Sequence, residues 1–224
     1  MQEFGSLLNK YEIAKKEIAM KKVTSTDAVV VIPEIKINTA VLTIEGDSPL
    51  ISHAWSQKAK QMMLDTQMKK PKQAREAKDP WADFCDSLYW LTTRPEKTTP
   101  DNIKEAKFGF PAVAFKAAAV DACSSVDGIT KVQARGAFHI AGDMVEIQGS
   151  PEIREDMVRV GMGAADIRYR GEFSKWSATF TIRFNPNVLS VAQIANLFNI
   201  AGFAVGIGEW RPQKDGSYGM FHVK

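Results

Sequence analysis

The sequence predicts an α+β protein whose strands form an antiparallel sheet. Segments of alternating hydrophobicity, typical of strands, lie at 29–46, 129–148 and 176–184. Two long apolar segments with helix-start signals, 111–125 and 186–202, lie between and after them. The composition, with 45% hydrophobic and 25% charged residues, is that of an ordinary globular domain, and the chain is long enough to bury a core.

Residues 1–28 are predicted to form a helical extension. Apolar side chains stand among lysines and glutamates there, namely Leu7, Tyr11, Ile18 and Met20. Ser6 is a suitable N-cap for this helix. The segment lacks the continuous apolar run of a signal peptide, and no stretch of the chain approaches the ~18 apolar residues of a membrane span. We therefore expect a cytoplasmic protein without a membrane partner, with Cys85 and Cys123 as buried free thiols.

Residues 29–224 are expected to form the main domain, with an insertion at about 53–107. The first strand is marked by the alternation of Ile35, Ile37, Thr39, Val41 and Thr43. In the insertion, the basic segment 55–78 fits two helical pieces broken at Pro71. Its sign bias favours contact with a polyanion, although a solvated charged face explains such a run equally well. A helix capped by Asp79 follows it.

The second half of the chain is expected to supply the remaining strands and helices. The clearest strand turns Trp176, Ala178, Phe180, Ile182 and Phe184 toward the core. The strands on either side of "AGD" (141–143) should form a hairpin, and the Arg-rich segment 151–173 should be loop with one short strand. Ser190 caps the last helix and Gly202 ends it. "FAVGIGEW" and "YGMFHV" are predicted to pair as a final hairpin.

Without the insertion, the predicted order of elements is β-α-β-β-α-β. This is the ferredoxin-like, or RRM-like, arrangement, in which two helices cover one face of a four-stranded antiparallel sheet. The other face stays open. RNA-recognition domains of this topology stack bases on that open face.

Three segments resemble motifs of the RAMP superfamily, the ferredoxin-like proteins that form the backbones of CRISPR complexes. "GFPAVAFKAAAV" (109–120) resembles its helix-opening motif, with Phe110, Pro111, Phe115 and Lys116 at matching places and alanine or valine where the family has glycine and serine. "GDSPLISH" (46–53) is similar to the step after its first strand. "GIGEWRPQKDGSYGMF" (206–221) is similar to its glycine-rich loop, with fewer arginines. The whole chain also resembles an uncharacterised family of bacteriophage proteins.

The resemblance implies a phage-encoded, CRISPR-like subunit in the host cytoplasm that polymerises as a filament along a single strand. The interleaved cations and aromatics of "IRYRGEFSKW" (167–176) agree with strand binding, which needs both phosphate neutralisation and base stacking. We therefore expect a non-catalytic RNA- or ssDNA-binding homo-oligomer without cofactor or metal. The expected contact residues are Lys58, Lys60, Lys69, Lys70, Lys72, Arg75, Lys116, Arg168, Arg170, Trp210, Arg211, Lys214 and Tyr218.

Two other function classes stay open. Some RAMP proteins cleave RNA with a histidine, and this chain has three, at His53, His139 and His222. The chain could instead be a phage structural or assembly protein that does not bind nucleic acid. It contains no nucleophile elbow or Walker loop. The net charge of +3 and the pI of about 8.8 permit a polyanionic ligand without requiring one.

Overall fold

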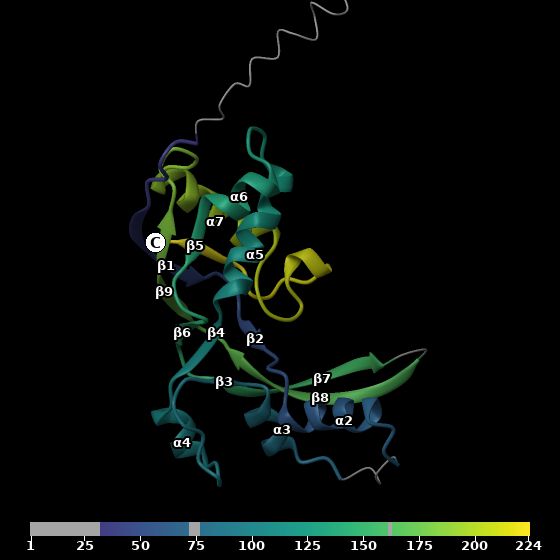
Figure 1. Ribbon diagram of the computed structural model, residues 1–224. Coiled ribbons are helices and arrows are strands. Elements are labelled where there is room, and N and C mark those ends of the chain that lie inside the picture. The colour runs from purple at the N-terminus through teal and green to yellow at the C-terminus, as the bar shows by residue number, and fades with distance from the viewer. Residues whose placement is uncertain (1–31, 72–76, 161–162) are drawn as a thin grey trace, which may run out of the picture. The chain divides into compact units, whose positions relative to one another are not determined.

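The computed structural model describes residues 32–71, 77–160 and 163–224 (Figure 1). The chain divides into two compact units, Met1–Ile35 and Lys36–Lys224. In the first unit, the described residues 32–35 are exposed and form no helix or strand. The predicted extension 1–28, with its helix, lies outside the described residues.

The second unit is an α+β structure with two antiparallel sheets. The larger, seven-stranded sheet has the order β10 (Phe221–Val223), β1 (Asn38–Gly46), β9 (Ser177–Phe184), β6 (Met144–Gln148), β4 (Phe108–Pro111) and β3 (Tyr89–Trp90), with β5 (Phe138–Ile140) also paired to β9. The smaller sheet has the order β2 (Leu50–Ser52), β8 (Ala164–Phe173) and β7 (Glu152–Val160). The described residues contain six α-helices: α2 (Gln57–Gln67), α3 (Pro80–Asp86), α4 (Pro100–Glu105), α5 (Ala112–Ala122), α6 (Lys131–Ala137) and α7 (Val191–Ala204).

Helices α5 and α7 cover one face of the larger sheet (Figure 1). Phenylalanines join the two layers: the ring centres of Phe115 and Phe180 lie 5.4 Å apart, and those of Phe138 and Phe198 lie 5.9 Å apart. Trp176 and the alternate residues after it on β9 are buried, as predicted. Local signals for both helices are also confirmed, because Pro111 precedes α5 and Ser190 caps α7 through the amide of Gln193.

In strand β1, the residues of the predicted alternation lie on the exposed side of the strand. Leu42 and Ile44 are buried, whereas Val41 is 63% exposed and Ile37 is 46% exposed. Apolar residues occupy both phases of this strand, so alternation alone could not tell which face meets the helices. The outward face therefore carries the odd-numbered side chains, including Thr39.

The predicted hairpin around residues 141–143 is wrong. β5 and β6 both pair with β9 and follow one another along the same line. Ile147 follows Ile140 by seven positions, but their partners Ala178 and Ile182 on β9 are only four positions apart, so the extra residues form a bulge. The segment before β5 is helix α6 rather than strand, since Thr130 and Gln133 cap its start reciprocally.

Two further predictions in the second half are corrected. The Arg-rich segment 151–173 forms a regular hairpin, β7–β8, with nine cross-strand pairs. The final hairpin is wrong, because α7 continues through Gly202 to Ala204 and β10 pairs with β1 instead. Gly206 and Gly208, predicted to lie in a strand, are turn residues with φ of 67° and 79°.

The segment predicted to be an insertion contains α2, α3, β3 and α4. Asp79 caps α3 as predicted, accepting from the amides of Trp81 and Ala82. Cys85 and Cys123 are buried free thiols. Within the described residues, none of the helices combines the length and apolar character that crossing a bilayer requires.

Candidate nucleic-acid interface

The C-terminal loop, residues 205–219, is a fixed structure with many backbone hydrogen bonds. Ile207 N donates to Gly219 O at 3.0 Å, and Glu209 N donates to Ile51 O on β2 at 3.1 Å. Gly219 N donates to Pro49 O at 2.8 Å. Five of its residues have left-handed φ values, namely Gly206, Gly208, Trp210, Asp215 and Gly219. The loop is therefore hydrogen-bonded both internally and to β2 of the smaller sheet.

Trp210 is held in a strained and exposed position on this loop. Its φ is 53°, and its side chain remains 42% exposed. A bulky residue at positive φ costs roughly 1–3 kcal/mol, and such strain concentrates at functional sites. Tyr218 N donates to Trp210 O at 3.0 Å, and a Cβ at Gly216 would lie 1.8 Å from the same oxygen. The surrounding loop thus fixes the strained conformation.

Among the described residues, the two cations next to Trp210 form no close ion pair with a carboxylate. Arg211 donates to the backbone oxygen of Gly208 at 3.1 Å and to Gln213 Oε1 at 3.1–3.2 Å, and both acceptors are neutral. Lys214 is exposed two positions after Pro212, in a short 3-10 turn. An exposed indole and two cations therefore share one rigid loop.

A pocket of about 320 Å³ lies beside the loop. Its apolar lining includes Phe110 from β4, Ala114 from α5 and Ile207 from the loop. At its polar side, His53 Nδ1 lies 3.1 Å from Glu209 Oε1. The hydrogen bond with His53 lowers the pKa of Glu209, and the charges of Arg170 and Arg211 lower it further, whereas burial raises it. The net shift is downward, so this carboxylate is ionised near neutral pH.

Arg170 and Tyr218, both predicted contacts, interact with other side chains of the protein. Arg170 is only 4% exposed and pairs with buried Asp156 at 3.1 Å. Arg154 connects this ion pair to Tyr218 on the loop: its Nε is 2.8 Å from Asp156 Oδ1, and its guanidinium carbon lies 4.6 Å from the centre of the Tyr218 ring. Arg168 is partly exposed, with Nε 3.5 Å from a carboxylate oxygen of Asp166. Of these residues, Arg168 alone keeps substantial exposure of its charge.

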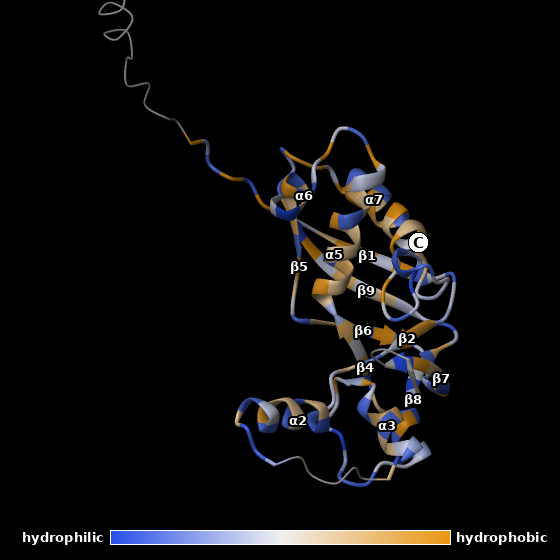
Figure 2. Cartoon of the chain, turned by 90° about the vertical axis from the view of Figure 1, so that its right-hand side faces the viewer, coloured by the Kyte–Doolittle hydropathy of each residue, from blue (hydrophilic) through white to orange (hydrophobic). Residues whose placement is uncertain are grey.

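The basic segment is divided between described and undescribed residues. Lys58, Lys60, Lys69 and Lys70 lie on or directly after α2, whereas Lys72 and Arg75 lie outside the described residues. Lys60 Nζ lies 5.7 Å from the centre of the Trp55 ring, and Lys70 Nζ lies 2.9 Å from Asp65 Oδ1. Helix α2 buries no residue, and polar and apolar residues mix along it (Figure 2). These lysines are accessible to a ligand without being arranged around a cavity.

A basic cluster that the sequence did not reveal lies at the edge of the larger sheet. Lys116 Nζ is 2.9 Å from His139 Nδ1 and 2.9 Å from the backbone oxygen of Arg135. His139 on β5 lies directly opposite Arg183 on β9. Only Lys116 was a predicted contact, because the other residues come together through strand pairing and not through sequence spacing.

The outward face of the central strands β1 and β9 differs from a base-stacking platform. Its side chains are Thr39, Val41, Thr43, Glu45, Ser177, Thr179, Thr181 and Arg183. None of these residues is aromatic, so stacking of bases on this face, expected from the topology, has no side chain to support it here. The exposed indole of Trp210 is the better candidate for a stacking contact.

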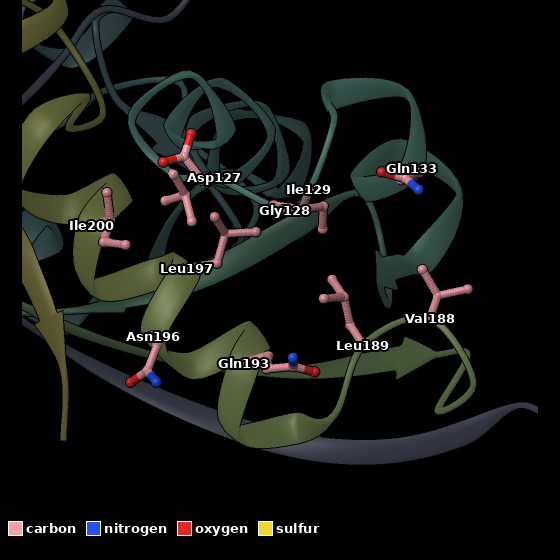
Figure 3. A pocket seen from close by; sticks show the side chains of 11 residues that line it. Asp127, Gly128, Ile129, Gln133, Val188, Leu189, Gln193, Asn196, Leu197 and Ile200 are labelled. Carbon is pink, nitrogen blue, oxygen red and sulfur yellow. The ribbon is translucent and has the colours of Figure 1, made fainter.

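A second pocket, of about 410 Å³, lies between α7 and the segment before α6 (Figure 3). Leu189, Leu197 and Ile200 line it together with Gln193, and Asp127 is the charged residue in its lining. Nothing in this lining identifies a ligand. In the part of the chain that the structure describes, no group of three or more histidine, cysteine or acidic side chains is placed to hold a metal ion.

Comparison with models of known protein families and with curated proteins finds no match to this chain.

Proposed function

We propose that this chain is a non-catalytic, single-strand nucleic-acid-binding protein that oligomerises along its ligand. The observation that carries the proposal is the strained, exposed Trp210 beside Arg211 and Lys214. Stacking on an aromatic ring gives about 1–3 kcal/mol per base and tolerates any sequence, because every base has a π-face. Cations beside the ring neutralise the phosphates that flank the stacked base.

The fold order supports the ferredoxin-like part of the proposal. β1, α5, β5–β6, β9, α7 and β10 follow one another along the chain, and their strands lie in the order β10-β1-β9-β6. This is the strand order expected for a β-α-β-β-α-β domain. On this proposal the smaller sheet, α2 and α3 are additions to that core. The resemblance to RAMP proteins and to a bacteriophage family extends the proposal to a phage-encoded subunit of a filament.

The test is the affinity of a fluorescein-labelled single strand, measured by anisotropy. We expect Trp210→Ala to weaken binding about 5- to 150-fold, corresponding to the loss of one stacked base. Lys214→Ala should weaken binding of all sequences alike and reduce the slope of log K against log salt by about 0.7–0.9. Oligo-dT and oligo-U compared side by side assign the preference between DNA and RNA.

Phe203→Ala is the matched control, since Phe203 is 75% exposed on α7, outside the loop. It should bind as the wild type does. A wild-type protein without strand affinity at low salt, or a Trp210→Ala variant of unchanged affinity, would contradict the proposal. Assembly of identical oligomers with and without a strand would favour the structural-protein alternative.

The pair of His53 and Glu209 favours a second candidate, an endoribonuclease. A carboxylate that hydrogen-bonds an imidazole orients it for general acid or base catalysis, and His53 remains 34% exposed beside the pocket. On this candidate, His53→Ala abolishes strand cleavage and leaves binding unchanged. His222→Ala is the control, since His222 pairs with Asp47 at a different place on the sheet edge. Intact RNA after long incubation with the wild type would exclude cleavage.

A further inference from the structure

The basic cluster at the β5 edge consists of Lys116, His139 and Arg183, with Arg135 beside them. These residues come from four elements: α5, β5, β9 and α6. His139 and Arg183 are exposed, whereas Lys116 is half-buried. The trio shares one place on the surface, so an approaching ligand meets all three side chains.

The hydrogen bonds fix the protonation state of His139 in the unliganded protein. Lys116 Nζ is 2.9 Å from His139 Nδ1 and donates to the backbone oxygen of Arg135. An ammonium group can only donate, so Nδ1 must be the acceptor and the imidazole is neutral, with its proton on Nε2. Lys116 thus occupies the position at which His139 would otherwise bind a second proton.

The electrostatics of the cluster are unfavourable without a ligand. Burial lowers the pKa of His139, and the charges of Lys116 and Arg183 lower it further. Burial also lowers the pKa of Lys116. The groups facing the imidazole are Lys116 from α5, the Arg135 carbonyl from α6 and Arg183 from β9. The charges of Lys116 and Arg183 thus oppose protonation of the imidazole, and a bound anion would offset that repulsion.

We propose that Lys116, His139 and Arg183 form a binding site for a phosphoryl oxyanion, in which His139 takes up one proton as the anion binds. The anion accepts hydrogen bonds from the ammonium of Lys116 and the guanidinium of Arg183. Lys116 releases Nδ1 when it turns to the anion, and Nδ1 takes a proton from bulk water. In the proposed function this anion is a phosphodiester of the strand. The site itself does not require the Trp210 loop.

Proton uptake fixes the sign of the pH dependence. The anion raises the pKa of His139 in the complex above its lowered value in the unliganded protein. Affinity therefore increases as pH falls between these two pKa values, by up to about tenfold per pH unit for one proton. At pH values below the pKa of the unliganded protein, His139 is protonated both in the free protein and in the complex, so the affinity no longer depends on pH. The lower end of this window lies below the ordinary histidine pKa of about 6.5, because burial and the two neighbouring cations lower the pKa of His139 in the unliganded protein.

The experiment measures oligo-dT affinity at about pH 5.5, 6.5 and 7.5 and constant ionic strength, in wild type and in His139→Gln. The phosphodiester does not titrate in this range. The wild type should bind several-fold more tightly per unit of falling pH, and His139→Gln should lose most of that dependence. His222→Gln is the matched control, an exposed histidine on β10 that pairs with Asp47, and should follow the wild type. Arg183→Gln should lower affinity at every pH.

A second measurement separates this inference from the proposed function. The imidazole NMR signal of His139, assigned from its loss in His139→Gln, is titrated with and without sulfate, which stays a dianion throughout. The pKa of His139 should rise when sulfate is present. A rise with sulfate but no affinity for any strand would support a free-anion site and overturn the proposed function alone. Strand binding with equal pH dependence in wild type and His139→Gln, and a His139 pKa unmoved by sulfate, would overturn the inference alone.

Discussion

Asp156→Ala should lower the free energy of unfolding by about 3–5 kcal/mol, because it leaves a buried arginine without its counter-charge. Arg170 is 4% exposed and Asp156 is 7% exposed, with 3.1 Å between their charged atoms. Arg170 Nε has no hydrogen-bond partner among the described residues. The carboxylate that pairs with this guanidinium is Asp156, through Nη1. Urea unfolding followed by tryptophan fluorescence measures the loss as a lower midpoint at an unchanged slope.

Two companion variants make this prediction specific to the buried pair. Asp156→Leu combined with Arg170→Met should recover most of the lost stability, since apolar residues of similar volume need no counter-charge in the interior. Asp101→Ala removes an exposed carboxylate that lies 3.5 Å from Lys104 on α4, and should change stability by less than about 0.5 kcal/mol. An Asp156→Ala variant as stable as Asp101→Ala would contradict the assignment.

The same ion pairs explain why the β7–β8 hairpin could not be predicted from the sequence. Nearly half of its residues are charged, and a polar segment is ordinarily a loop. The structure pairs these charges along and across the strands: Arg154 lies 2.8 Å from Asp156 on the same strand and 2.6 Å from Glu172 on β8. Such complementarity depends on register, which single-sequence periodicity does not contain. The fold class was nevertheless predictable, because the apolar strand β9, the proline before α5 and the serine cap of α7 are strong local signals.

The candidate interface was predictable only where it is local in sequence. Trp210, Arg211 and Lys214 lie together in one glycine-rich segment and were identified from it. The turn conformations of Gly206 and Gly208 were not, because alternating glycines fit a strand as well as a loop. Likewise, "IRYRGEFSKW" suggested Arg170 as a contact, but the pairing of β7 and β8 buries it. His139 and Arg183 lie far apart in sequence, and only the pairing of β5 with β9 places them opposite one another.

Gly202→Ala in α7 should destabilise the protein, although helix propensity alone predicts that replacing glycine by alanine stabilises a helix. In an uncrowded helix interior, glycine to alanine stabilises by about 0.8–1 kcal/mol. At Gly202, an added Cβ would lie 1.7 Å from the backbone oxygen of Phe221, so α7 and β10 could not keep their contact. We expect Gly202→Ala to lower stability by about 3 kcal/mol, the upper range for overpacking, and the melting temperature by about 6–12 °C.

Gly136 in α6 is the matched control for Gly202, because an added Cβ there meets nothing within 4 Å. Gly136→Ala should therefore raise the melting temperature by a few degrees, as helix propensity requires. Calorimetry measures both melting temperatures. A decrease for Gly202→Ala together with an increase for Gly136→Ala would show that the loss of stability comes from the contact between α7 and β10, and not from replacing a helical glycine as such. Stabilisation by both substitutions would mean that α7 does not approach β10 this closely. The contact matters for the whole sheet, since β10 pairs with β1 through Ile44 and Val223, and Val223 N also donates to Asn199 Oδ1 of α7 at 2.7 Å.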